Sequence, residues 1–188
     1  MRDEILRKKQ ERDGNWYRYK LPLNIDGVEQ VFSVFPRRLK SVTSDGQLLG
    51  GELVRINEDY KYRPYRYSYG FTGFAGHGVD GGGFEEWALV KMDASAHIAD
   101  EGKGCNYSVK IWKRENCYPS EPIFVSRNEG DNSDEDDGVI LSLVYDGERR
   151  ESFLLVLDAR EMTELARCYT DCRTCISFHG AFLPYKKN

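Results

Sequence analysis

The sequence predicts an all-β fold, and three observations support this prediction. First, Tyr and Phe, which favour strands over helices, number 12 and 9 in a chain of 188 residues. Second, several short segments alternate polar with apolar residues, the period-2 pattern of strands with one buried face. Third, turns rather than helices separate these segments, as in an antiparallel arrangement.

The predicted strands follow one another through most of the chain. They cover residues 16–21, 30–34, 48–56, 65–69, 87–92, 107–112, 123–125, 138–145, 152–157 and 163–167. Segments 139–144 and 153–157 are almost wholly apolar and are expected to be buried on both faces. The polar segment 146–150 between them predicts a hairpin turn. Two stretches are expected to be irregular, a glycine-rich loop at 71–83 and an acidic, solvated loop at 127–137.

The sequence divides into two regions. Residues 1–15 form a charged lead-in segment, and residues 16–188 form the β-structure. The predicted strands would make fewer than three four-stranded blades, whereas a closed propeller needs roughly four to eight. Such a piece leaves a strand edge open, which other strands must cover. We therefore expect the β-structure of these residues to be incomplete.

Composition argues against several classes of protein. Charged residues make up 31% of the chain and the net charge is -4, so no basic surface is expected to attract nucleic acid. No apolar run approaches the roughly 20 residues of a membrane span. The first ten residues carry acids and no apolar stretch, so we expect a cytoplasmic location, with a mitochondrial one as the alternative. The five cysteines, an odd number, are expected to be free and mostly buried thiols.

Several short motifs carry the functional information. Tyr-Pro-Ser-Glu-Pro occupies residues 118–122, Glu-Asp-Asp-Gly occupies 135–138, and Phe-His-Gly occupies 178–180. Farther upstream, Gly-Glu-Leu-Val-Arg-Ile-Asn at 51–57 precedes a Tyr-rich segment at 65–70. In this order, the motifs resemble the carboxy-terminal part of the carotenoid cleavage oxygenase family. Its animal branch, which includes β-carotene oxygenases and the retinoid isomerase, fits best.

The resemblance implies both a fold and an activity. The parent protein would be a seven-bladed β-propeller, in which this chain supplies the carboxy-terminal blades and upstream segments supply the missing ones. Fe(2+) would lie on the propeller axis, held by four histidines. The reaction would be the cleavage of a carotenoid double bond by O2 into two carbonyl products. Carotenoid or retinoid would be the substrate, and apolar patches would make peripheral contact with a membrane.

The resemblance also assigns roles to three residues. His179, in the Phe-His-Gly motif, would be one iron ligand, and the other three histidines would lie upstream of the chain. Glu121, in the Tyr-Pro-Ser-Glu-Pro motif, and Glu52, in the Gly-Glu-Leu-Val-Arg-Ile-Asn motif, would each accept the ring N–H of an iron-bound histidine and so fix its tautomer. Taken alone, His179 would more often be an ordinary core or surface residue, and Glu121 an acid in a surface turn. His77 and His97 match no ligand position.

Three alternatives remain open. One is a retinoid isomerohydrolase of the same family, which shares the iron site but rearranges a retinyl ester. Another is a truncated, non-catalytic product that binds apolar pigment or nothing. The last rests on the spacing of Cys168, Cys172 and Cys175, which equals that of radical S-adenosylmethionine enzymes and, with His179, also suits zinc. Against it, the chain lacks the alternating helix–strand pattern of an α/β barrel.

Overall fold

The computed structural model describes residues 16–18, 37–39, 52–75, 84–93, 108–127, 134–171, 174 and 178–184. These residues form eleven β-strands and one turn of 3-10 helix, η1 (Glu58–Tyr60). Since this part of the chain contains no α-helix, the predicted all-β fold is confirmed. Within the same residues, no helix is long and apolar enough to cross a membrane. The charged lead-in segment predicted at 1–15 lies outside the described residues.

The first sheet is a four-stranded antiparallel meander. Its strands, in chain order and in spatial order, are β3 (Glu52–Arg55), β4 (Tyr67–Ala75), β5 (Phe84–Asp93) and β6 (Ser108–Lys113). β4 and β5 pair along almost their whole length. Two short strands that precede this sheet, β1 (Trp16–Arg18) and β2 (Arg37–Leu39), pair with each other.

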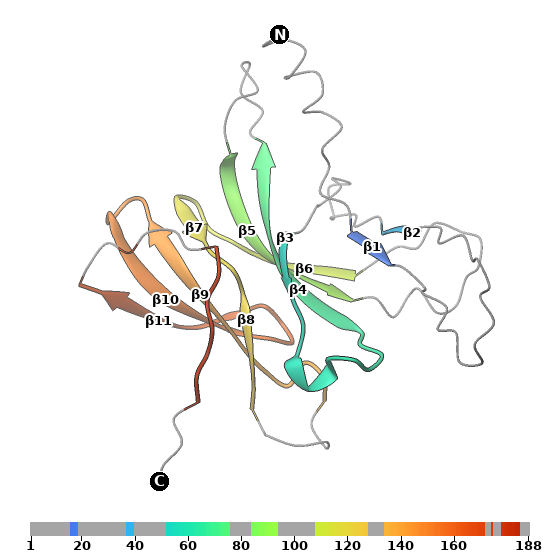
Figure 1. Ribbon diagram of the computed structural model, residues 1–188. Helices are drawn as coiled ribbons and strands as arrows, with labels where there is room; N and C mark the ends of the chain where they lie inside the picture. The colour runs from blue at the N-terminus through green and yellow to red at the C-terminus, as the bar shows by residue number, and fades with distance from the viewer. Residues whose placement is uncertain are drawn as a thin grey trace, which may run out of the picture.

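The second sheet repeats the same arrangement with one interruption. Its strands are β7 (Cys117–Pro119), β8 (Ile123–Ser126), β9 (Gly138–Asp146), β10 (Glu151–Asp158) and β11 (Glu164–Thr170). β7 and β8 pair with opposite ends of β9, so they act as one strand that is broken at residues 120–122. Counted in this way, both sheets are four-stranded meanders, the strand arrangement of a propeller blade (Figure 1).

The two sheets share one hydrophobic core. Tyr69 of β4 stacks on Phe124 of β8 with 5.6 Å between ring centroids, and its hydroxyl donates a hydrogen bond to Ala159 O (3.2 Å). The buried members of this core come from both sheets and are Tyr69, Leu89, Trp112, Cys117, Ile140, Val144, Phe153, Leu155, Leu157, Ala159 and Met162. Because these side chains pack together, the two sheets are held in place relative to each other.

The sequence prediction is wrong in two places within these sheets. The glycine-rich loop expected at 71–83 is strand β4 as far as residue 75, where Phe71 lies opposite Leu89 and packs on Trp87 with 4.9 Å between ring centroids. Aromatic residues at alternate positions favour a strand here despite the glycines. β7 is an additional strand, which the sequence hides because Pro119 is a residue that strands mostly avoid.

Replacement of Phe153 by Ala tests the shared core. Phe153 is fully buried in β10, and its ring contacts Tyr169 with 5.1 Å between centroids. Because the substitution leaves a cavity, we expect Phe153→Ala to lower the free energy of unfolding by about 4 kcal/mol in urea denaturation. Leu154, the next residue along β10, is 36% exposed, so Leu154→Ala should cost about 1 kcal/mol. Equal losses from the two variants would contradict the assigned core.

Candidate functional site

Glu121 lies where the first strand of the second sheet is interrupted. Pro119 and Pro122 flank it, and neither has an N–H group to donate to β9. The backbone is nevertheless held, because Ser120 N donates to a carbonyl oxygen of β9 (2.9 Å) and Ser142 Oγ donates to Ser120 O (3.0 Å). As a result, Glu121 is only 5% exposed although it belongs to no strand.

The Glu121 carboxylate gathers hydrogen bonds from residues that are distant in the sequence. Arg55, at the end of β3, donates from Nε to Oε1 (2.8 Å) and from Nη2 to Oε2 (3.1 Å). Gly180 N donates to Oε2 (2.9 Å), and His179 Nδ1 lies 3.2 Å from Oε1. We call these four residues the Glu121 cluster. It joins the first strands of both sheets to segment 178–184, which runs beside β8 in Figure 1.

The electrostatics of the cluster keep Glu121 ionised. Burial raises the pKa of the Glu121 carboxyl, but the hydrogen bonds from Arg55, Gly180 and His179 outweigh burial and hold the pKa below its ordinary value. In turn, the hydrogen bond to Glu121 raises the pKa of Arg55. Both groups are therefore charged at neutral pH, and Glu121 acts only as an acceptor of hydrogen bonds.

His179, the predicted iron ligand, thus lies next to one of the two predicted glutamates. Because Glu121 only accepts, Nδ1 of His179 carries a hydrogen, and in the neutral imidazole Nε2 then carries the lone pair. A carboxylate on one ring nitrogen and a lone pair on the other is the arrangement of a metal-binding histidine, so this donor fits ferrous iron. Within the part of the chain that the structure describes, no three His, Cys, Asp or Glu side chains group closely enough to hold a metal ion.

Glu52, the other predicted glutamate, begins β3 and is exposed. It pairs with Phe71 of β4, and a β-bulge, at which Leu53 has a φ of 52°, separates it from Arg55. Among the described residues, the Glu52 side chain makes no hydrogen bond or ion pair, so it takes no part in the Glu121 cluster. Its role stays a prediction, because the histidine that it would orient is expected outside this chain.

Arg55 is the residue of the cluster that sequence analysis missed. It lies in the same motif as Glu52, but 66 residues separate it from Glu121 and 125 separate it from Gly180. The spacing of residues within a short motif does not predict contacts between residues so far apart in the sequence. One signal was available: a carboxylate held between two prolines and buried in a strand break needs a donor, and a nearby cation is the usual one.

The remaining predicted candidates are not tested by the structure. His77 and His97 lie outside the described residues, as do Cys172 and Cys175. Cys168 is an exposed free thiol in β11. The cysteine-based alternative therefore stays a hypothesis about residues that the structure does not describe.

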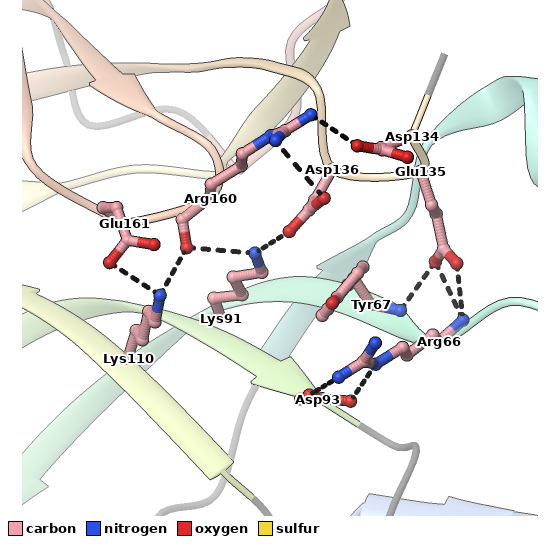
Figure 2. A pocket seen from close by; sticks show the side chains of 10 residues that line it. All are labelled: Arg66, Tyr67, Lys91, Asp93, Lys110, Asp134, Glu135, Asp136, Arg160 and Glu161. Atoms are coloured by element: carbon pink, nitrogen blue, oxygen red, sulfur yellow. Dashed lines mark hydrogen bonds and ion pairs between the residues drawn. The ribbon is translucent and has the colours of Figure 1, made fainter. Parts of the chain in front are cut away.

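A second candidate site is a hollow of about 630 Å³ between the first sheet and the turns of the second. Its walls are mostly charged, as Figure 2 shows, and are formed by Arg66, Tyr67, Lys91, Asp93, Lys110, Asp134, Glu135, Asp136, Arg160 and Glu161. The hollow could bind a charged ligand only if some of these cations or acids were not already paired with each other.

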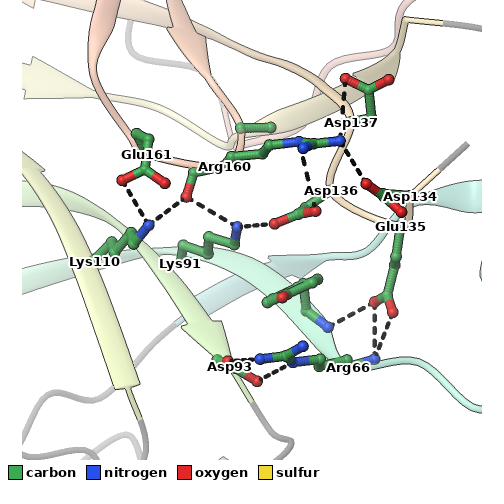
Figure 3. Close-up of polar contacts among 12 residues, drawn as sticks. Arg66, Lys91, Asp93, Lys110, Asp134, Glu135, Asp136, Asp137, Arg160 and Glu161 are labelled. Carbon is green, nitrogen blue, oxygen red and sulfur yellow. Dashed lines mark hydrogen bonds and ion pairs between the residues drawn. The ribbon is translucent and has the colours of Figure 1, made fainter.

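The cations of this hollow are all paired with acids. Lys91, with 5% of its side chain exposed, lies 2.6 Å from Asp136 and 4.1 Å from the centre of the Tyr67 ring. Burial lowers the pKa of Lys91, although the hydrogen bond to Asp136 opposes this effect. The other pairs, drawn in Figure 3, are Arg66 with Asp93 (2.6 Å), Lys110 with Glu161 (2.8 Å) and Arg160 with Asp134 (2.8 Å). Such a saturated network connects structural elements and leaves no cation without a carboxylate for an anionic ligand.

The network also corrects the prediction of a solvated acidic loop at 127–137 for residues 134–137; residues 128–133 lie outside the described part of the chain. Glu135 accepts hydrogen bonds from Tyr67 N (2.6 Å) and Arg66 N (2.8 Å), and burial raises the pKa of its carboxyl. Glu135 and Asp136 therefore pack against the first sheet, whereas Asp134 pairs with Arg160 and stays exposed. An acidic run is easily taken for a solvated loop, because the sequence does not show that its cationic partners lie in other strands.

Comparison with known proteins identifies the family. A β,β-carotene 15,15′-dioxygenase of Mus musculus is 32% identical over 182 residues, which are 89% of this chain and 29% of the mouse protein. The family model described as retinal pigment epithelial membrane protein matches residues 1–184. The chain belongs to the carotenoid oxygenase family. Another family member, a carotenoid dioxygenase of Neurospora crassa, is 39% identical over 137 residues, 71% of this chain and 19% of that protein.

Solved structures of carotenoid oxygenases and their relatives share the fold. A point mutant of the Synechocystis apocarotenoid oxygenase matches with a TM-score of 0.56 and 26% identity, over 79% of this chain and 27% of that one. The lignostilbene dioxygenase of Pseudomonas brassicacearum gives a TM-score of 0.65 at 23% identity, over 89% of this chain and 32% of that one, a likeness of fold alone. The chain thus spans between 19% and 32% of the length of these proteins.

Replacement of Glu121 by Gln tests the electrostatics of the Glu121 cluster. Because Gln keeps the shape but loses the charge that Arg55 and Gly180 bind, Glu121→Gln should lower the free energy of unfolding by about 2 kcal/mol at pH 7. The pKa of Glu121 is held low in the folded state, so its contribution is complete above the ordinary pKa of Glu. It is lost as the pH falls through the folded-state value, so the difference between the two proteins should be smaller in acid than at pH 7.

Urea denaturation at pH 7 and pH 3 measures both effects. Glu148→Gln is the matched control, because Glu148 is exposed in a turn and accepts only a long hydrogen bond from Asn116 Nδ2 (3.4 Å). It should change stability by less than about 0.5 kcal/mol at either pH. A loss in Glu121→Gln that is the same at both pH values would argue against an ionised Glu121 as the centre of the cluster.

Proposed function

We propose that this chain forms the carboxy-terminal part of a non-haem iron(II) dioxygenase that cleaves a carotenoid double bond with O2 and gives apocarotenoid carbonyl products. The pair of His179 and Glu121 carries the proposal, because it presents an imidazole lone pair in a fixed tautomer, as a metal ligand requires. The substrate class comes from the relatives, which are named β,β-carotene 15,15′-dioxygenase and carotenoid dioxygenase.

Each residue of the site has a defined task in this proposal. His179 would hold Fe(2+) through Nε2, and three further histidines would come from segments outside this chain. The chemistry that ferrous iron would supply there is the activation of O2. Glu121 holds the hydrogen of His179 at Nδ1 and fixes the plane of its ring. Glu52 does the same for a histidine of another segment.

The surface around His179 supports a site that further chain completes. Large apolar side chains are exposed there, with Phe178 at 75%, Phe182 at 49% and Leu183 at 84%. A neighbouring hollow of about 440 Å³ lies between β8 and residues 180–184. Exposed apolar surface of this kind is typical of regions that another segment or an apolar ligand covers. We propose that the remaining blades of the same propeller cover this surface. We also propose that the complete protein makes a peripheral contact with a membrane, from which a lipid-soluble substrate enters.

A second candidate function shares the same iron site. A carotenoid isomerooxygenase of Galleria mellonella is 37% identical over 177 residues, so a relative whose name includes isomerisation is as similar to this chain as the named dioxygenases. A retinoid isomerohydrolase would use the Glu121 cluster in the same way. Chromatography of the products separates the two, because cleavage of a double bond yields shorter carbonyl compounds, whereas an isomerohydrolase yields a fatty acid and an isomerised retinol whose polyene chain is intact.

Removal of His179 tests the proposed function directly. In the complete protein that contains this chain, we expect His179→Ala to lose most of the bound iron and to lower carotenoid cleavage by more than about 100-fold, since a missing ligand should cost more than a missing outer-sphere partner. Iron is measured by elemental analysis and products by chromatography. Lys110→Gln is the control, because Lys110 belongs to the charged hollow, and it should keep both properties. Full iron content and activity in His179→Ala would rule the proposal out.

The chain by itself should behave differently from the complete protein. One imidazole ligand among the described residues is too few to hold iron in competition with water, so the isolated chain should retain no stoichiometric iron after dialysis and should cleave no carotenoid. The same elemental analysis and product assay apply. Tight iron binding with activity in the isolated chain would contradict the need for further histidines.

A further inference from the structure

We propose that Arg55 is a positioning residue of the iron site, which fixes the tautomer and orientation of His179 by holding Glu121 in place. The inference rests on the proposed function, because the tautomer of His179 matters only if His179 binds iron through a ring lone pair. Its structural basis is independent of the metal, because it concerns only hydrogen bonds within this chain.

The geometry of Arg55 is that of a fork that spans the whole carboxylate. Nε and Nη2 reach the two oxygens of Glu121 at 2.8 and 3.1 Å, and Nη2 also donates to Gly180 O at 3.3 Å. Paired donors of this kind define the plane as well as the position of a carboxylate. The side chain of Arg55 is 33% exposed and that of Glu121 only 4%, so the fork closes over a buried acid.

Four donors saturate the carboxylate. Oε1 faces Arg55 Nε and His179 Nδ1, while Oε2 faces Arg55 Nη2 and Gly180 N. A carboxylate offers about four acceptor positions, and the guanidinium and the backbone amide have hydrogens to donate and nothing with which to accept. An acid that faces a two-point guanidinium and a backbone N–H is held as the carboxylate and has no hydrogen to give, so the fourth contact is Nδ1–H of His179, and in the neutral imidazole the lone pair is on Nε2.

Arg55 matters because few other contacts hold Glu121 in this orientation. Gly180 N contacts a single oxygen and leaves the carboxylate able to turn about that bond. His179 is 73% exposed, so most of its ring surface faces solvent rather than packed side chains, and its contact with Glu121 bears directly on its orientation. In water the neutral imidazole of histidine carries its hydrogen mainly on Nε2, and only a hydrogen bond such as this one reverses that preference. Loss of the fork thus favours the tautomer that is unable to bind iron through Nε2.

The closing experiment reads the tautomer without any metal. The chain is labelled with ¹⁵N-histidine, and its Nδ1 and Nε2 resonances are recorded at about pH 8, above the ordinary pKa of imidazole. Three histidines make the assignment simple. The wild-type chain should show the hydrogen of His179 on Nδ1. In Arg55→Gln the Nδ1 resonance should shift toward that of an unprotonated nitrogen, and in Arg55→Lys, which keeps the charge but not the fork, the shift should be smaller.

Arg66→Gln is the matched control. Arg66 makes the same kind of two-point contact, with Asp93 at 2.7 and 2.6 Å, but in the charged hollow. It should lower stability without moving the His179 resonances, which excludes a merely structural effect. An Arg55→Gln spectrum with the hydrogen still on Nδ1, or equal shifts in Arg66→Gln, would overturn the inference. If Arg55→Gln does not fold, Arg55→Lys decides by the same criterion.

A second readout in the complete protein separates this inference from the proposed function. Release of iron to a ferrous chelator should be about tenfold faster in Arg55→Gln than in the wild type, the size expected when an outer-sphere partner is lost. Unchanged release would overturn the positioning role. A complete protein that binds no iron, yet shows the tautomer shift, would instead overturn the proposed function and leave the hydrogen-bond assignment of Arg55 standing.

Discussion

A buried carboxylate that needs donors is the constraint around which this part of the molecule is organised. Glu121 lies between two prolines in a broken strand, where its own backbone neighbours provide little compensation for its charge. Donors therefore come from elsewhere, namely Arg55 on the first strand of the other sheet and Gly180 near the carboxy terminus. Arg55 and Gly180 occupy three acceptor positions of the Glu121 carboxylate, and the remaining position accepts the hydrogen bond from His179. Stability and the orientation of the candidate ligand thus depend on one group.

The rest of the structure places these donors. The shared core around Tyr69 and Phe153 fixes the two sheets against each other, so that the end of β3 faces the break between β7 and β8. On the side of the turns, Lys91 connects the first sheet to the acidic loop through Asp136. The shared core and the ion pairs together fix the two sheets relative to each other. The contacts of the Glu121 cluster depend on this fixed arrangement.

The sequence predicted the strands best where apolar residues dominate. The segments predicted at 138–145 and 152–157 are strands β9 and β10, and the hairpin between them is confirmed by the pairing of Asp146 with Glu151. Expectation of burial on both faces was only partly right, because Leu154 of β10 is 36% exposed. Prediction failed where glycine and proline conceal strands, as at residues 71–75 and at Pro119, because local preference is outweighed there by pairing with neighbouring strands.

The sequence likewise predicted only part of the candidate site. The motifs around His179 and Glu121 pointed to both residues, whereas their direct contact and the part played by Arg55 depend on how the two sheets pack. No local pattern contains that information. A crystal structure of the iron-loaded complete protein would test the account most directly. We predict iron bonded to Nε2 of His179, with Nδ1 on Glu121 and Glu121 still held by Arg55. Iron bound without His179, or a Glu121 carboxylate turned away from it, would contradict the account.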